Sequence, residues 1–95
     1  MPKGYLIAHI RVRDKEAFEE FKQLSGAAIK AHNGRVLVRN PAPDHREGAA
    51  QGLAIVIEFQ SIEAARSFYE SDAYSEARAI RENISDTDLI LAEGL

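Results

Sequence analysis

The chain has 95 residues, of which 45% are hydrophobic and 28% charged, as is typical of one globular domain. It contains no cysteine, which excludes disulfides, thiolate metal sites and cysteine nucleophiles. The net charge of −3 is uneven: residues 1–48 carry 9 basic and 6 acidic side chains, and residues 49–95 carry 3 and 9. The basic residues are scattered in an acidic chain, so the pattern does not indicate a nucleic acid as partner.

Several other classes of protein are disfavoured by what the chain lacks. Its longest apolar run, Leu53 to Ile57, is far too short to cross a membrane. The first five residues do not form the apolar stretch of a secretion signal, so we expect a cytoplasmic protein. Glycine-rich phosphate loops are absent, and the three histidines do not share metal-ligand spacing. We therefore expect no metal and no cofactor.

The first half predicts a strand, a helix and a second strand. Residues 5–12 alternate, with Leu6, Ala8, Ile10 and Val12 on one face and Tyr5, Ile7, His9 and Arg11 on the other. Asp14 fits the N-cap of a helix that runs to about residue 31. Apolar residues on one side form the inward stripe, and the charged residues, including Lys22, are expected outside. Asn33-Gly34 suits the helix end, and residues 35–39 follow as a strand.

The second half predicts a loop, a strand, two helices and a last strand. Residues 40–52 hold two prolines and two glycines and indicate a loop, and the β-branched residues 53–59 form a strand. Ser61 caps one helix, Ser71-Asp72 interrupts, and a further helix covers about residues 73–83. The last strand is expected at residues 88–92.

The order of elements is β-α-β-β-α-β, with the second helical region split. This order predicts one α+β domain over residues 1–95, of the ferredoxin-like class, with a four-stranded antiparallel sheet and the helices on one face. The other face, which carries Tyr5, Ile7, His9 and Arg11, is half apolar and needs a cover. Two such sheets packed face to face would form a homodimeric α/β barrel.

Several segments in order resemble a known family. They are Gly34-Arg35-Val36-Leu37-Val38-Arg39, Glu47-Gly48, the stretch from Ile57 to Tyr74, Arg81, and Glu93-Gly94. Together they resemble the family of domains of unknown function catalogued under the number 1330. The resemblance implies a dimeric α/β barrel, of the superfamily that includes small cofactor-free monooxygenases and muconolactone isomerase. It carries over no catalytic residue, because the family has no established reaction.

The chain departs from the family pattern at several positions. Asn33 replaces the first glycine of a pair, which is harmless because asparagine tolerates positive φ. Gln60 and Asp72 replace prolines. Asn40-Pro41 replaces a Gly-Gly pair after Arg39, and the proline restricts the path of the loop there.

Two residues are candidates for proton transfer. His9 lies within a strand on its less apolar face, where an imidazole can move a proton near neutral pH or pack in a dimer core. Glu58 lies between Ile57 and Phe59, where burial would raise its pKa and make it a general base. The alternative for Glu58 is pairing with an arginine on a neighbouring strand. His32 at a helix end and His45 in the loop are weaker candidates.

Five further residues are candidates for ligand binding. Arg39, at a strand end, could hold a carboxylate or phosphate through its planar fork, or pair with Glu47 or Glu58. Tyr69 and Tyr74 flank the turn at Ser71-Asp72 and could wall a pocket or pack in the core. The remaining two candidates are Arg81, which could pair with Asp14 or Glu82 or close the pocket, and Asp14, mainly a cap.

These residues predict a homodimer that binds a small polar or anionic metabolite in a pocket near Arg39, Glu58, His9 and the two tyrosines. In an enzymatic version, His9 or Glu58 would move a proton while Arg39 holds an anionic group. The first alternative is a cofactor-free monooxygenase or isomerase. The second is a structural or regulatory dimer without a site.

Overall fold

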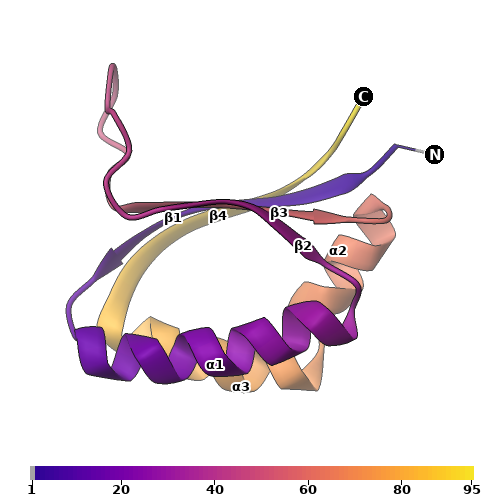
Figure 1. The fold of residues 1–95 in the computed structure, drawn as a ribbon, viewed down its shortest axis with the longest axis horizontal. Helices are drawn as coiled ribbons and strands as arrows, with labels where there is room; N and C mark the ends of the chain where they lie inside the picture. The colour runs from indigo at the N-terminus through magenta and orange to yellow at the C-terminus, as the bar shows by residue number, and fades with distance from the viewer. Residues whose placement is uncertain (1) are drawn as a thin grey trace.

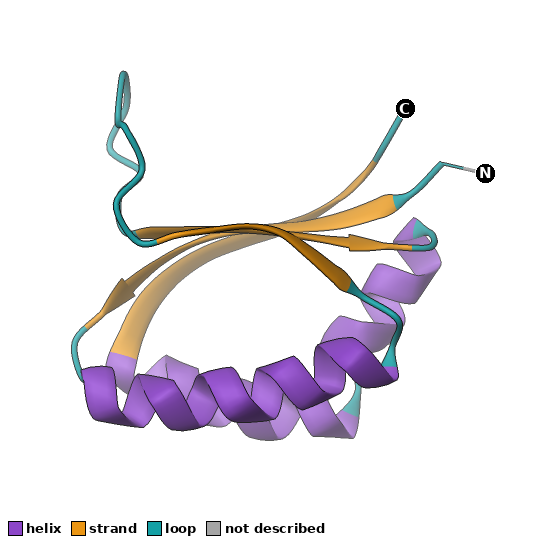
Figure 2. Ribbon diagram, in the orientation of Figure 1, coloured by secondary structure: helices purple, strands orange, loops and turns teal. Residues whose placement is uncertain are grey.

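A computed structural model describes residues 2–95 and has the expected order of elements (Figure 1). The order is β1 (Gly4–Val12), α1 (Lys15–Ala31), β2 (Arg35–Asn40), β3 (Leu53–Phe59), α2 (Ile62–Tyr69), α3 (Asp72–Ile84) and β4 (Ser85–Glu93). The four strands form one antiparallel sheet in the order β2-β3-β1-β4. All the helices lie on one face of the sheet, and the opposite face carries none (Figure 2). The chain therefore has the expected α+β, ferredoxin-like fold.

The hydrophobic core fills the layer between the sheet and the helices. Alternation in β1 directs Leu6, Ala8 and Ile10 into this layer, where all three are buried. Phe18, Phe21 and Ile29 of α1 pack against them from the helix side, at the helical spacing of an inward-facing stripe. The largest fully buried side chains are those of Phe59 and Phe68, and they lie in contact with centroids 4.9 Å apart.

A polar side chain caps the start of each helix, and the sequence predicts Asp14 and Ser61 as caps and Ser71 as part of an interruption. The side chains of Asp14, Ser61 and Ser71 each accept a hydrogen bond from a backbone amide of the helix that follows. Asn33 follows α1 with a φ of 58°, so its tolerance of the left-handed region is used. No helix within residues 2–95 is long and apolar enough to span a membrane.

The start of the last strand differs from the sequence prediction. β4 begins at Ser85 rather than at residue 88, because its first residues pair along the end of β1. Two ion pairs accompany this pairing: Arg11 bonds Asp88 and Arg13 bonds Asp86, each at 3.0 Å. The polar residues before 88 therefore belong to the strand.

Candidate functional site

A cavity with mostly apolar walls lies between the sheet and the helices. Its inner part has a volume of about 40 Å³ and is lined by side chains from all seven helices and strands. It continues into a wider cleft of about 630 Å³ between α1, the end of β1 and the start of β3. The inner part and the cleft share five lining residues: Ile10, Phe18, Lys22, Arg39 and Leu53. The cleft has the size of known small-molecule sites.

A β-bulge at Leu37 brings Arg39 to this cavity. Val36 lies opposite Ile57 and Val38 lies opposite Val56, so Leu37 is an extra residue in β2. In a regular strand, Arg39 would point to the face opposite to that of Val36, because side chains alternate. The extra residue shifts the alternation, and both Val36 and Arg39 line the cavity. Redirecting a side chain in this way is a known effect of bulges at sheet edges.

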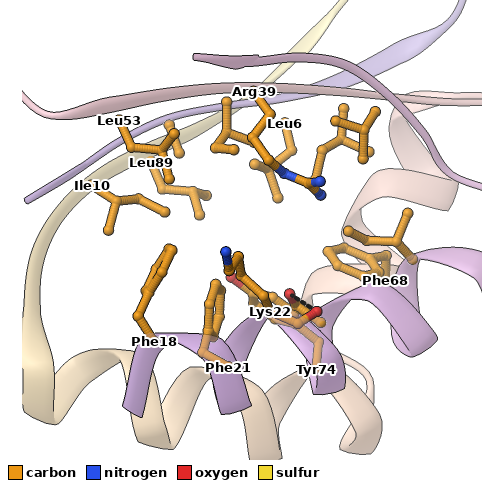
Figure 3. Close-up of a pocket in the computed structure, with 16 residues that line it drawn as sticks. Leu6, Ile10, Phe18, Phe21, Lys22, Arg39, Leu53, Phe68, Tyr74 and Leu89 are labelled. Carbon is orange, nitrogen blue, oxygen red and sulfur yellow. Dashed lines mark hydrogen bonds between the residues drawn. The ribbon is translucent and has the colours of Figure 1, made fainter. Parts of the chain in front are cut away.

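Two cationic side chains enter the layer from opposite walls, Arg39 from the sheet and Lys22 from α1 (Figure 3). The ammonium of Lys22 bonds the carboxylate of Glu19 at 2.7 Å and lies 5.8 Å from the centre of the Phe18 ring. Arg39 makes no ion pair within residues 2–95, so the expected pairing with Glu47 or Glu58 is not formed. Arg39 is thus a solvent-exposed cation without a protein counter-ion at the mouth of an apolar cavity.

The sheet separates residues that the sequence analysis placed in one pocket. His9 lies opposite Ala54, and Glu58 lies opposite Tyr5. By the alternation of side chains along the strands, His9 and Glu58 are on the face of the sheet that points away from the helices. Arg39 lies on the helix side of the same sheet. Within one chain, His9 and Glu58 therefore do not join Arg39 around a common ligand.

Glu58 has a partner that the sequence analysis did not name. The hydroxyl of Tyr5 donates to Oε2 of Glu58 at 2.9 Å, and the expected ion pair with an arginine is not formed. This hydrogen bond raises the pKa of Tyr5 above its ordinary value of 10.0. Ionisation of the phenol would break the bond and place two negative charges side by side.

The pKa of Tyr5 predicts how stability changes in alkaline solution. Because this pKa is higher in the folded chain than in the unfolded one, the Tyr5–Glu58 bond stabilises fully below pH 10 and is lost as the pH rises through the folded pKa. We expect the free energy of unfolding of Tyr5→Phe to fall less steeply with pH above pH 10 than that of the wild type. Urea unfolding across this pH range measures the difference. Parallel curves for the two proteins would contradict the assignment.

Tyr74 lies at the inner end of the cavity and is 4% exposed. Burial raises the pKa of Tyr74 above its ordinary value of 10.0, although the neighbouring guanidinium of Arg81 opposes the shift. The phenol therefore stays protonated at neutral pH, and its hydroxyl shares a side-chain hydrogen bond with Arg81. Tyr69, its neighbour at a centroid distance of 5.5 Å, instead lines a separate polar cleft near the start of β4.

Arg81 lies in the wall of that second cleft and is 5% exposed. Neither carboxylate expected to pair with it does so. Asp14 caps α1 by accepting from the amide of Ala17 at 3.1 Å, and Glu82 bonds Arg78 at 2.7 Å. Asp14 is accordingly placed as a cap, away from both the cavity and the second cleft.

The two weaker histidine candidates occupy unrelated places. His32 ends α1, where Nδ1 lies 3.0 Å from the carbonyl of Ala28 and the ring packs edge-on against Phe68. His45 is exposed in the loop between β2 and β3. No cluster of acidic and histidine side chains suited to a metal ion occurs among residues 2–95.

Sequence reasoning missed Lys22 and the bulge. Lys22 is one turn after Phe18 on the stripe that faces the sheet, and this spacing could have placed it at the cavity. It was expected outside because lysine is usually solvated. The bulge has no comparable signal, since Leu37 lies within an apolar run that fits a regular strand equally well.

A row of apolar side chains crosses the open face of the sheet. Val38, Val56, Ile7 and Ile90 occupy neighbouring register positions on β2, β3, β1 and β4. Val38 is 39% exposed and Ile90 is 58% exposed. Polar residues lie on both sides of the row: Arg35, Glu58 and Tyr5 on one side, His9, Asp88 and Arg11 on the other.

Comparisons with solved structures support the fold over nearly the whole chain. A protein of unknown function from Rhodopseudomonas palustris has a TM-score of 0.78 at 18% identity, covering 99% of this chain and 83% of that one. SnoaB, a cofactor-independent oxygenase from Streptomyces nogalater, has a TM-score of 0.73 at 10% identity, covering 97% and 92%. A dimeric protein with a ferredoxin-like fold from Bacteroides fragilis has a TM-score of 0.65 at 13% identity, covering 96% and 95%.

These structural matches show that the fold is shared. At such low sequence identities they do not show whether any activity is shared. No curated protein matches the chain. One family model does match, over residues 3–95, which include both clefts and the open sheet face. The chain therefore belongs to the family described as a domain of unknown function, DUF1330.

Proposed function

We propose that this protein binds a small organic carboxylate with an apolar body in the cavity between its sheet and its helices. The observation that carries the proposal is Arg39, which the bulge turns to the cavity and which has no counter-ion in the described chain. A guanidinium holds a carboxylate through two parallel hydrogen bonds. Lys22, on the opposite wall, is paired with Glu19 at 2.7 Å, so Arg39 is the cation that the proposal relies on.

The shape of the cavity supports an amphipathic ligand. Its inner part of about 40 Å³ has room for the end of an apolar group, while the cleft of about 630 Å³ accommodates the remainder. The apolar walls favour a hydrocarbon or aromatic body, because burying such a surface is favourable at about 25 cal/mol per Å². Tyr74 belongs to the lining at the inner end.

Binding fits the cavity better than acid–base catalysis does. Within residues 2–95, the inner cavity has no histidine, aspartate or glutamate in its lining, and its phenol is protonated at neutral pH. A cofactor-free oxygenase or isomerase reaction, the alternative function, would have to use the reactivity of the ligand itself. This alternative is supported by the fold that the chain shares with SnoaB, a cofactor-independent oxygenase.

The same proposal includes a homodimer formed through the open face of the sheet. The apolar row of Val38, Val56, Ile7 and Ile90 has polar residues on both sides, the usual anatomy of an interface. A two-fold axis would place each row against its copy. The dimeric Bacteroides fragilis protein, which has the same fold, supports this reading.

A thermal-shift screen against short aliphatic and aromatic carboxylates tests the binding proposal. A ligand that binds the native state raises the unfolding midpoint by mass action. We expect Arg39→Met to bind such a ligand about 10- to 100-fold more weakly, the loss of a charge-assisted hydrogen-bonded pair. Arg66→Met, which removes an exposed arginine of α2, should bind like the wild type.

Two results would count against the binding proposal. If no carboxylate raises the midpoint, the reading as a structural or regulatory dimer gains weight. If a carboxylate binds but Arg39→Met retains full affinity, the ligand lies elsewhere. Product analysis of a bound ligand in air, without added cofactor, separates binding from the oxygenase alternative.

A further inference from the structure

A second cleft, separate from the cavity, lies between α3 and the start of β4. It has a volume of about 410 Å³ and a mainly polar lining. Arg81 and Tyr69 line it, together with Thr87 and Leu89 of β4. The family model assigns no function to this part of the chain.

Arg81 is the unusual group in this cleft. Its side chain is buried, since the residue is only 5% exposed. Its Nε is buried without a hydrogen-bond partner, and the guanidinium makes no ion pair within residues 2–95. A buried charge without a counter-ion is strongly unfavourable. The neighbouring Tyr74 shares a side-chain hydrogen bond with the Arg81 guanidinium, but it does not neutralise the charge, because burial raises the pKa of the phenol and keeps it protonated at neutral pH.

The other charges around the cleft are already balanced. Arg78 bonds Glu82 at 2.7 Å, and its guanidinium lies 5.2 Å from the centre of the Tyr69 ring. The remaining two charged residues of the lining form ion pairs at 3.0 Å with residues outside the lining, Arg11 with Asp88 and Asp86 with Arg13. These pairings leave the charge of Arg81 as the uncompensated one.

Neutral hydroxyls complete the site. The hydroxyls of Tyr69 and Thr87 belong to residues of the lining. That of Thr87 lies 3.4 Å from the hydroxyl of Ser85, a long contact that it can exchange for a bound oxygen by rotating. Ser85 is engaged, because its hydroxyl donates to the carbonyl of Arg81 at 2.7 Å. We propose that this cleft binds a small oxyanion, a carboxylate or phosphate group, with Arg81 as its counter-ion. The proposal is independent of the ligand at Arg39.

Inorganic phosphate and acetate are the probes, each compared with chloride at equal ionic strength. We expect both to raise the unfolding midpoint of the wild type with saturation, and to raise that of Arg81→Met only by the smaller, unsaturating amount that general salt effects produce. General stabilisation by phosphate affects both proteins and cancels in the comparison. We also expect Arg81→Met in chloride to be at least as stable as the wild type, because it removes an uncompensated buried charge.

A second variant keeps the test decisive if Arg81→Met fails to fold. Thr87→Val preserves the shape of a half-buried side chain and removes one hydroxyl. We expect it to bind phosphate about five-fold more weakly than the wild type, the effect of one hydrogen bond. An unchanged phosphate affinity in Thr87→Val, together with a less stable Arg81→Met, would show that Arg81 is satisfied within the protein and would overturn the proposal.

Arg39→Met distinguishes this site from the cavity. It should keep the phosphate response of the wild type, because Arg39 does not line the second cleft. If Arg39→Met loses the response while Arg81→Met retains it, the anion binds in the cavity. That result would overturn the second site and support the first. If Arg81→Met is instead monomeric where the wild type is dimeric, a carboxylate of the second copy is the counter-ion, and the small-anion site is wrong.

Discussion

Phe68→Ala is expected to lower the free energy of unfolding by about 3–5 kcal/mol. Phe68 is 0% exposed and lies at the centre of an aromatic cluster. Its ring centroid is 4.6 Å from that of Tyr74, 4.9 Å from that of Phe59 and 5.7 Å from that of His32. The substitution removes these contacts and leaves a void between α2, α3 and the sheet. A domain of this size has about 5–15 kcal/mol of stability in total, so the loss is a large part of it.

Urea unfolding at one fixed protein concentration measures this loss, since association would otherwise shift the midpoint. Leu95→Ala is the matched control, because Leu95 is a fully exposed apolar residue and its truncation should change stability by less than about 0.5 kcal/mol. Phe68→Leu should lie between the two. A loss below about 1 kcal/mol in Phe68→Ala would show that the cluster does not anchor the core.

The parts of the fold that the sequence predicts are those governed by local chemistry. Asp14, Ser61 and Ser71 were predictable as caps or interruptions because each helix start needs a side-chain acceptor within three residues. The two faces of β1 were predictable because alternation is a property of any strand. The order of elements then restricted the topology to a small set, of which the ferredoxin-like sheet is the observed one.

The parts that the sequence did not predict depend on pairing between distant segments. The bulge at Leu37 depends on how β2 aligns with β3, and it alone decides on which face Arg39 lies. The partner of Glu58 likewise depends on cross-strand register, because the register places Tyr5 opposite Glu58. The site expected from the sequence therefore divides between the two faces of the sheet. Residue types identified candidates, whereas register determined which of them meet.

The start of β4 shows the same limit. Asp86 is polar and was predicted to lie outside the strand of residues 88–92, because aspartate is depleted in strands. In the folded chain, register places Asp86 opposite Arg11 and Asp88 opposite His9, and their ion pairs with Arg13 and Arg11 favour an extended backbone.

Ile90→Lys is expected to dissociate the proposed homodimer, with a dissociation constant at least 100-fold above that of the wild type. Ile90 is 58% exposed on the open face, so a lysine there stays hydrated in a separate chain and leaves its fold intact. In a two-fold dimer, the same ammonium would be buried twice against an apolar row, and unpaired buried charges are strongly unfavourable. A 100-fold change corresponds to about 2.7 kcal/mol.

Sedimentation over a range of protein concentrations measures this dissociation, and circular dichroism verifies that the variant remains folded. Ala73→Lys is the matched control, since it adds the same charge at an exposed position of α3 on the helix side of the sheet. It should keep the wild-type dissociation constant. If both variants remain dimeric, the dimer does not use the open face. If the wild type is monomeric at all concentrations, the apolar row of Val38, Val56, Ile7 and Ile90 must have another cover, because a face of this composition is unfavourable in water.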